Sequence, residues 1–266
     1  MRTEISVTEL VYYPLKSGRG INAQSARVVR RGLQNDRRWM LVDTHGVFLT
    51  ARTHPQLLRI RATPGDNGTL ELSDDSGRRI KAELTGRTET MNVEIWGCQT
   101  SGLTFDSSID EWLSNLTGIG CRLVYMSTDV VRPIKSSPGD EVSYADGYPL
   151  LLTNGESLAH LNEKLSTPVS MGAFRPNVVI EDAKAFAELG WNTLRIGAVE
   201  FKSGGACVRC AMTVLDPQTG QRRTDGEPLK TLSDYQRTSS GVVFGVNLIP
   251  VNRGTIRVGD PVKILD

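Results

Sequence analysis

The sequence predicts a mainly β fold with a few helices. Short segments in which apolar and polar side chains alternate recur through the first part of the chain. Turn-forming Gly, Asn, Asp and Ser residues separate several of these segments, and the apolar spacing of a helix is restricted to a few places. Strands that are this short and this closely spaced are typical of a β sandwich or barrel.

The amino-terminal half of the chain supplies most of these strands. Residues 4–12 alternate as a strand does and lead into residues 13–20, where a proline and glycines predict a loop. The apolar segment 39–43 is predicted to be a buried strand, with 47–51 pairing back on it as a hairpin. Further strands are expected at residues 23–31, 57–62, 69–73, 79–83 and 92–96.

Two segments have the spacing of an amphipathic helix. Residues 107–117 place their apolar side chains on one face, and Ser107 or Ser108 is expected to cap the first turn. The second helix is predicted to run through residue 165 after a capping box of Thr153 and Glu156. Prolines, serines and charges at 129–141 predict a mobile connector. The remaining strands are expected at residues 121–126, 148–152, 178–180, 193–196, 198–202 and 242–251, with a strand pair at 255–266.

Composition excludes several classes of protein. The chain has 266 residues, enough for one large or two smaller domains, and its 31 basic and 30 acidic residues give a net charge of +1. That balance does not support binding to a nucleic-acid polymer. No apolar run reaches the roughly 18 residues that a membrane span needs, and the first residues do not form a secretory signal. Cysteines in a chain without an export signal indicate reduced thiols in a cytoplasm.

One stretch, residues 204–220, concentrates soft-ligand and nucleophile chemistry. Cys207 and Cys210 lie three positions apart with Arg209 between them, and a neighbouring cation favours the thiolate form. The pair is compatible with dithiol exchange, a zinc site, one thiolate ligand to a soft metal, or two thiols packed in a strand. The residues after Cys210 are predicted to form a strand that ends in a turn, which disfavours a thioredoxin-like site. The scattered positions of the other cysteines and the histidines disfavour zinc.

Four cationic residues border predicted strands rather than polar helix faces. They are Lys16, Arg37, Arg175 and Arg209. Cationic side chains that converge at strand ends would form an anion pocket, and guanidinium groups suit phosphate. Taken singly, each is better explained as a surface charge or as half of an ion pair, and sequence spacing does not show that they meet.

The order of several short motifs points to a family. The motifs are Tyr13-Pro14-Leu15-Lys16-Ser17, Asp36-Arg37-Arg38-Trp39, Thr50-Ala51-Arg52, Phe174-Arg175-Pro176-Asn177, Cys207-Val208-Arg209-Cys210 and Val258-Gly259-Asp260-Pro261-Val262. Over nearly the whole chain this order resembles the MOSC family, named after the carboxyl-terminal part of molybdenum cofactor sulfurase. Further motifs make the chain similar to the bacterial YcbX type, which resembles the mitochondrial amidoxime-reducing component. These are Trp96-Gly97, Ala145-Asp146-Gly147-Tyr148-Pro149 and Glu227-Pro228-Leu229-Lys230-Thr231-Leu232.

The resemblance implies a fold and a cofactor. It implies an amino-terminal β-barrel domain, residues 1–125, packed on a MOSC β-barrel domain, residues 126–266, with a molybdenum–molybdopterin cofactor between them. Cys210 would supply a thiolate to molybdenum, and Cys207 would not be a metal ligand. Val208 stands where many relatives have serine, so main-chain contacts are expected to serve there. The residues implied to hold the cofactor or line its site are Lys16, Ser17, Arg37, Asp146, Gly147, Arg175, Asn177, Arg209 and Asn247.

The resemblance also implies a reaction. The expected activity is the reduction of N-hydroxylated compounds, such as hydroxylaminopurines or amidoximes, with Asp146 suggested as the acid that protonates the leaving oxygen. Some YcbX-type proteins continue into a ferredoxin-like domain that this chain lacks, so a separate ferredoxin- or flavodoxin-type reductase is expected as the electron donor. The alternatives are a carrier that passes cofactor or sulfur from Cys210 to client enzymes, and a degenerate domain with an empty site. Pyridoxal phosphate is suggested for the wider fold, but no lysine is marked out as a Schiff-base partner.

Overall fold

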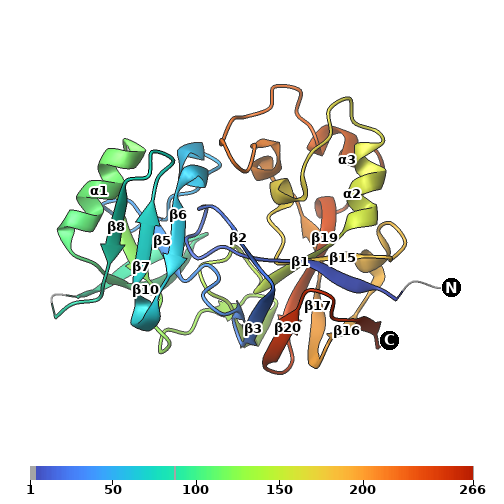
Figure 1. Cartoon of the computed structure of the whole chain (residues 1–266), viewed down its shortest axis with the longest axis horizontal. Helices are drawn as coiled ribbons and strands as arrows, with labels where there is room; N and C mark the ends of the chain where they lie inside the picture. The colour runs from blue at the N-terminus through green and yellow to red at the C-terminus, as the bar shows by residue number, and fades with distance from the viewer. Residues whose placement is uncertain (1–3, 87, 266) are drawn as a thin grey trace.

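The structure, a computed structural model, describes residues 4–86 and 88–265. The chain forms two lobes that lie side by side (Figure 1). The left lobe in that view, coloured cyan to green, contains α1 (Ser107–Thr117), and the right lobe contains α2 (Gly155–Asn162) and α3 (Leu229–Tyr235). None of the helices in the described ranges is long and apolar enough to cross a bilayer.

The first lobe is built from two antiparallel sheets, both contacted by α1. Alternation explains its strands, because Leu70 and Leu72 are buried while Glu71 between them is exposed. These leucines share one apolar core with Leu113 of α1. One sheet has the order β5 (Trp39–Val42), β11 (Arg122–Tyr125), β10 (Cys98–Thr104), β9 (Thr90–Ile95), and the other has β6 (Arg61–Pro64), β7 (Leu70–Ser73), β8 (Arg79–Ala82).

The second lobe contains the largest sheet. Its central strand β14 (Leu150–Asn154) is buried along its whole length, and α2 contacts it, so its side chains do not alternate between buried and exposed. Leu152, Phe201 and Leu248 meet in the core of this lobe. The strand order is β2 (Ile21–Ala23), β1 (Ser6–Tyr12), β15 (Val178–Glu181), β14 (Leu150–Asn154), β19 (Gly241–Pro250), β17 (Val199–Val208), β16 (Thr193–Ile196), β21 (Val262–Ile264), with β18 (Arg237–Thr238) beside β19.

The first strands of the chain belong to the second lobe. β1 pairs with β15, and β3 (Ser25–Val29) pairs with β20 (Gly254–Arg257) and with β4 (Gly32–Leu33). The chain enters the first lobe at β5 and leaves it after β11, so that lobe interrupts the second one (Figure 1). The expected division of the chain at residues 125 and 126 stays a prediction. The pairing adds that the segment before β5 joins the carboxyl-terminal sheet.

The mainly β class with a few helices is confirmed, but the sheets are not the closed barrels that the sequence predicted. The largest sheet runs in a linear order from β2 to β21. The start of β1 approaches the start of β21 through an isolated bridge between Ser6 and Pro261 and a hydrogen bond of 2.8 Å from Val262 N to Ile5 O. Because β21 is short, this contact does not extend into a continuous ladder.

Several local predictions were wrong. The segment 57–62 is not one strand, because a proline opens the 3₁₀ helix η1 (Pro55–Arg59) and β6 follows. The segment 47–51 does pair back on β5, through an antiparallel bridge between Phe48 and Val42 and a bond of 2.8 Å from Leu49 N to Leu41 O, but it forms no extended strand. The strands near the carboxyl end exist, but β20 pairs with β3 and β21 with β16 instead of with each other. The connector 129–141 contains a hairpin of β12 (Pro133–Ile134) and β13 (Ser137–Glu141). Further 3₁₀ helices are η2 (Asp66–Gly68), η3 (Met171–Phe174), η4 (Ala187–Gly190) and η5 (Ala211–Val214).

Both predicted helices exist, with caps one residue away from those expected. The Asp106 carboxylate accepts from Ser108 N at the start of α1, and the Asn154 side chain accepts from Glu156 N at the start of α2. Asp and Asn cap at least as well as Ser and Thr, so residue type alone did not separate neighbouring candidates. No helix was predicted at α3, whose buried residue Leu232 gives too short an apolar stripe for a periodic signal.

Replacing Phe201 with alanine should lower the free energy of unfolding by about 3–5 kcal/mol, because it leaves a cavity in a close-packed core. The Phe201 side chain is 0% exposed, whereas Val251 is 58% exposed and provides the control. Urea unfolding followed by circular dichroism measures both, and Val251→Ala should stay within about 0.5 kcal/mol of the parent. Equal stability of the two variants would contradict the described core.

Candidate functional site

A cavity of about 460 Å³ lies where the two lobes meet. Thr50 and Arg52 reach it from the first lobe, while Ala206 of β17 and Asn247 of β19 reach it from the second. Every residue for which the sequence predicted a site role lines this cavity, although their individual roles stay predictions. These residues are Lys16, Ser17, Arg37, Asp146, Gly147, Arg175, Asn177, Arg209, Cys210 and Asn247.

The cavity wall contains non-glycine residues with a left-handed backbone. The φ angles are 65° at Ser17, 49° at Arg37 and 54° at Arg175. Ser17 and Arg175 lie in turns beside Gly18 and Pro176, which accounts for the local reversals of the chain. A residue with a side chain in this region costs about 1–3 kcal/mol and is most often found where function requires its placement.

A buried carboxylate, Asp36, ties the segments behind the cavity together. It accepts hydrogen bonds from Tyr13 N at 2.8 Å, Arg37 Nη1 at 2.6 Å and Asn177 Nδ2 at 3.1 Å. Its side chain is 0% exposed. Burial raises the pKa of Asp36 above its usual value, while the Arg37 charge opposes that rise. The carboxylate therefore joins the loop after β1, the turn before β5 and the start of β15.

Two guanidinium groups lie against one aromatic ring. The Arg37 Cζ is 4.3 Å and the Arg175 Cζ is 4.1 Å from the centroid of the buried Tyr13 ring. Arg37 also bonds to Asn177 Oδ1 at 3.0 Å, but the buried Nη2 of Arg175 has no hydrogen-bond partner among the described residues. Burial lowers the pKa of Arg175 to about 10, and the nearby Arg37 charge adds to this effect. An anion in the cavity would satisfy this nitrogen.

Lys16 and Asp146 form an ion pair on the opposite part of the wall. The buried Lys16 Nζ donates to the Tyr144 carbonyl at 2.9 Å and to Asp146 Oδ1. Asp146 also accepts from Arg52 Nη2 at 2.7 Å and from Trp96 Nε1 at 3.0 Å. Burial lowers the pKa of Lys16, with Asp146 opposing. Loss of hydration works against ionisation of Asp146, but the Lys16 charge and its other donors hold the pKa of Asp146 well below its usual range.

The cysteine stretch presents two unequal thiols. β17 ends at Val208, and the 3₁₀ helix η5 follows Cys210, so the predicted continuation as a strand was wrong. Arg209 Nη1 donates to Cys207 Sγ at 3.0 Å and Arg209 Nη2 donates to the Phe174 carbonyl at 2.7 Å. Cys210 Sγ lines the cavity without a hydrogen-bond partner in the described part of the chain. Among the described residues no group of three or more His, Cys, Asp or Glu side chains could hold a metal ion, which leaves the zinc alternative without support.

The amide and glycine members of the site contribute differently. Asn177 is 1% exposed, and its side chain makes its hydrogen bonds within the protein, since Nδ2 also donates to the Val11 carbonyl at 3.0 Å. Its position favours a positioning role toward Arg37 rather than ligand contact. Asn247 Nδ2 donates to the Gly205 carbonyl at 3.2 Å, which supports the bend in β17. Gly147 is exposed at the cavity, and a side chain there would meet open space.

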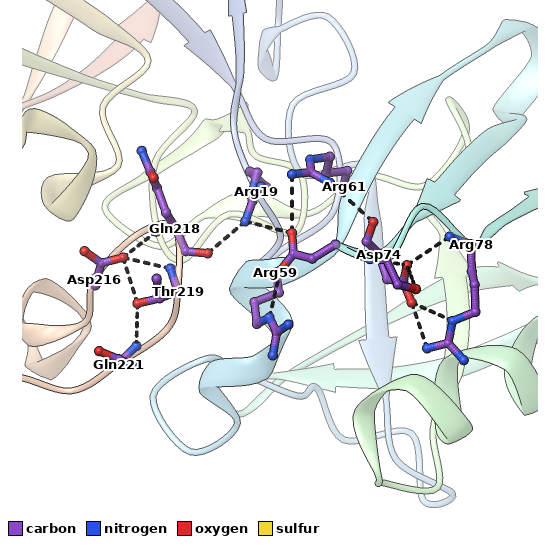
Figure 2. Close-up of polar contacts among 11 residues, drawn as sticks. Arg19, Arg59, Arg61, Asp74, Arg78, Asp216, Gln218, Thr219 and Gln221 are labelled. Carbon is purple, nitrogen blue, oxygen red and sulfur yellow. Dashed lines mark hydrogen bonds and ion pairs between the residues drawn. The ribbon is translucent and has the colours of Figure 1, made fainter.

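A second network holds the loop after η5 against the first lobe (Figure 2). Arg19 donates to the Gln218 carbonyl at 2.8 Å and lies 3.4 Å from the Asp75 carboxylate. Arg59 and Arg61 approach the same carboxylate at 2.8 Å and 3.3 Å. This network fixes the path of the chain that leaves the cysteine stretch. Its first member, Arg19, lies three residues after Lys16 of the cavity wall.

The sequence predicted no role for several residues that line or support the wall. The Tyr13 ring contacts both guanidinium groups, and Arg52 and Trp96 hold the carboxylate of Asp146 from the first lobe. Arg132 braces the Asp146 segment from behind, donating to the Ser143, Ala145 and Asp146 carbonyls. The available signal was indirect, because three of these residues occur within or beside the short motifs and Arg132 lies between the expected elements.

Comparison with known proteins agrees with this geometry. Residues 4–119 match the MOSC N-terminal beta barrel domain, and residues 139–263 match the MOSC domain. The chain belongs to the MOSC family. The two matches meet at the cavity, since Lys16, Arg37 and Arg52 fall in the first and Asp146, Arg175 and Cys210 fall in the second.

Curated relatives of this MOSC chain include proteins from animals and plants. It is 33% identical to mitochondrial amidoxime-reducing component 1 of Mus musculus, over 98% of this chain and 82% of that protein. It is 32% identical to mitochondrial amidoxime-reducing component 1 of Homo sapiens, over 98% of this chain and 83% of that protein. It is 30% identical to molybdenum cofactor sulfurase of Oryza sativa subsp. japonica, over 92% of this chain but 32% of that protein.

Replacing Asp36 with asparagine should lower the free energy of unfolding by about 3 kcal/mol, because one donor loses its partner and Arg37 loses a buried counter-charge. Chemical denaturation measures the change. Asp43→Asn is the matched control, since the Asp43 carboxylate accepts main-chain bonds in an exposed turn. If the two variants lost the same stability, Asp36 would not be the structural centre of the site.

Proposed function

We propose that the protein binds a molybdenum–molybdopterin cofactor in the large cavity and reduces N-hydroxylated compounds such as hydroxylaminopurines or amidoximes. The observation that carries this proposal is a free thiol at Cys210 on the same wall as guanidinium groups with unused nitrogens. Thiolate is a soft ligand that suits molybdenum, and guanidinium groups suit the phosphate of an anionic cofactor. The names of the relatives, which mention amidoxime reduction and molybdenum cofactor, support the same function.

The residues present fit such a group. The buried Arg175 Nη2 and Arg209 Nε have no partner among the described residues, and buried donors without partners cost free energy that an anion would return. The cavity of about 460 Å³ is large enough for part of such a cofactor with a small substrate beside it. Cys210 would hold the metal, while Arg175, Arg209 and Lys16 would hold the anionic portion. Asn177 and Tyr13 would keep Arg37 and Arg175 in place.

The bound cofactor would supply the two-electron change that N–O reduction needs. Reduction of an N-hydroxyl group also consumes protons and releases water, so the wall has to provide or relay a proton. Asp146 is held ionised by its donors and acts as a hydrogen-bond acceptor in this arrangement, which does not suit the role of general acid suggested for it. Lys16 Nζ lines the cavity with a proton, and burial makes that proton easier to release.

The proposal includes a partner and a compartment. We infer that a separate ferredoxin- or flavodoxin-type reductase delivers the electrons, that the substrate is a small molecule, and that the protein works in the cytoplasm. The motif resemblance supports the donor. The near balance of 31 basic and 30 acidic residues supports a small substrate over a nucleic-acid polymer.

Cys210→Ala should abolish bound molybdenum in protein made in a host that synthesises the cofactor, because the variant lacks the proposed thiolate ligand. Elemental analysis measures the metal content. Cys207→Ala is the matched control, since Cys207 lies in the same stretch but accepts from Arg209, and it should keep most of the metal. Equal molybdenum content in the parent and Cys210→Ala would remove Cys210 from its assigned role.

The parent protein, loaded with cofactor, should reduce a hydroxylaminopurine or benzamidoxime when a strong artificial donor supplies electrons. Product formation measured by chromatography tests this directly. A loaded protein that leaves both compounds unreduced would overturn the proposed reaction.

The plant relative named molybdenum cofactor sulfurase favours the carrier as the second candidate. A carrier should release cofactor or sulfur to an apo-enzyme, whereas a reductase should retain its cofactor through turnover.

A further inference from the structure

The cavity wall has a strongly unequal distribution of charge. Among its described residues, Lys16, Arg37, Arg52, Arg175 and Arg209 are cationic, and Asp146 is the one carboxylate. An N–H donor on a small molecule in this cavity therefore finds one anionic acceptor on the described wall. The question is whether Asp146 is free to serve it.

The two oxygens of Asp146 have different partners. Oδ1 accepts from the buried Lys16 and, at 3.0 Å, from Trp96 Nε1, so this oxygen is used by the protein itself. Oδ2 accepts from Arg52 Nη2 at 2.7 Å. The Lys16 side chain is 6% exposed, whereas the Asp146 side chain is 55% and the Arg52 side chain 27% exposed. The Arg52 contact is thus the accessible one, and ion pairs open to solvent hold weakly.

The main chain that carries Asp146 is held by hydrogen bonds, while Arg52 has a second contact besides Asp146. Arg132 holds the main chain that carries Asp146 through its bonds to the Ala145 and Asp146 carbonyls, at 2.6 and 3.0 Å. The Arg52 Cζ lies 4.2 Å from the centroid of the Trp96 ring, so Arg52 can stay on that ring when Oδ2 takes another donor. The φ angle of Trp96 is 52°, a left-handed value that is costly for a bulky residue, and its ring nitrogen bonds to Asp146 Oδ1.

The group that Arg52 presents to Asp146 resembles a class of ligand. A guanidinium is a planar carbon flanked by N–H groups, and carboxylates accept such planar N–C–N edges with good geometry. Amidines, amidoximes, hydroxyguanidines and aminopurines carry a planar N–C–N unit with at least one N–H donor, although the ring nitrogen of an aminopurine is an acceptor.

We propose that Asp146 Oδ2 is the anchor for the N–C–N unit of the substrate, accepting from one of its N–H groups, and that Arg52 occupies this position until substrate displaces it. This inference rests on the proposed function and names the feature that the site selects, a second nitrogen on the carbon next to the reacting nitrogen. Arg52 and Trp96 are then positioning residues, and Asp146 is a specificity residue. The low pKa of Asp146 agrees with an anchor that stays ionised.

Binding of benzamidine to the purified protein, measured by isothermal titration calorimetry, tests the anchor without any turnover. Asp146→Asn should weaken benzamidine binding by about 10- to 100-fold, since a charge-assisted bond is lost. Arg52→Gln should tighten it by about 2- to 5-fold, since an exposed competitor is removed. Asp75→Asn is the matched control, because Asp75 is also surrounded by arginines, outside the large cavity, and it should bind as the parent does.

An Arg52→Gln variant that binds benzamidine no more tightly than the parent would overturn the displacement, and this variant changes an accessible side chain whose loss does not threaten folding. An Asp146→Asn variant with parental affinity would overturn the anchor.

Kinetics with two substrates separate this inference from the proposed function. With the cofactor-loaded protein, Asp146→Asn should raise KM for benzamidoxime far more than for acetophenone oxime, which lacks the second nitrogen. Equal effects on the two substrates would sink the inference while leaving the reductase proposal standing. A parent protein that reduces neither oxime, yet binds benzamidine through Asp146, would sink the reductase proposal and leave the anchor in place.

Discussion

The buried carboxylate of Asp36 is the interaction on which the geometry of the cavity depends. It joins the main chain of Tyr13, the guanidinium of Arg37 and the amide of Asn177, which come from segments that are far apart in the chain. A carboxylate this deeply buried is costly by itself and is tolerated because each partner is a donor. Its negative charge also compensates part of the positive charge that the wall gathers beside it. The guanidinium groups of Arg37 and Arg175 both pack on the Tyr13 ring, and the nearby Asp36 carboxylate supplies a counter-charge for this packing.

The site concentrates several unfavourable features in a small volume. Left-handed backbone occurs at Ser17, Arg37 and Arg175, and buried nitrogens of Arg175 and Arg209 lack partners among the described residues. Burial lowers the pKa of Arg175 to about 10, and the neighbouring Arg37 charge adds to this effect. These costs are typical of a binding site that is completed by its ligand. The apolar cores of the two lobes, which contain Leu113 and Phe201, supply the stability that makes such a wall sustainable.

The sequence predicted the β class and the membership of the cavity better than it predicted how the members interact. Cys210 and Arg209 could be predicted as candidate site residues because a thiol and a neighbouring cation are adjacent in the sequence. The bond between Asp36 and Asn177 spans 141 positions, and no periodicity reports a contact of that kind. The bond from Arg209 to Cys207 Sγ depends on where the Arg209 side chain points, and the ionised state of Asp146 depends on donors from both lobes. Closure of the sheets failed as a prediction because it depends on the length of β21, which is too short for a continuous ladder with β1.

The place of the first strands in the second lobe has a consequence for synthesis on the ribosome. Thr8 of β1 bonds to Val179 of β15, 171 positions later, so the amino-terminal segment emerges long before its partner strand exists. The first lobe, from β5 to β11, is continuous in sequence and can fold during this interval, since domains generally fold as units as they emerge. Lys16 and Arg37 lie on the waiting segment, whereas Arg175 and Cys210 come from the last part to be made. The cavity is therefore assembled last, when the later strands pair with the strands at the start of the chain.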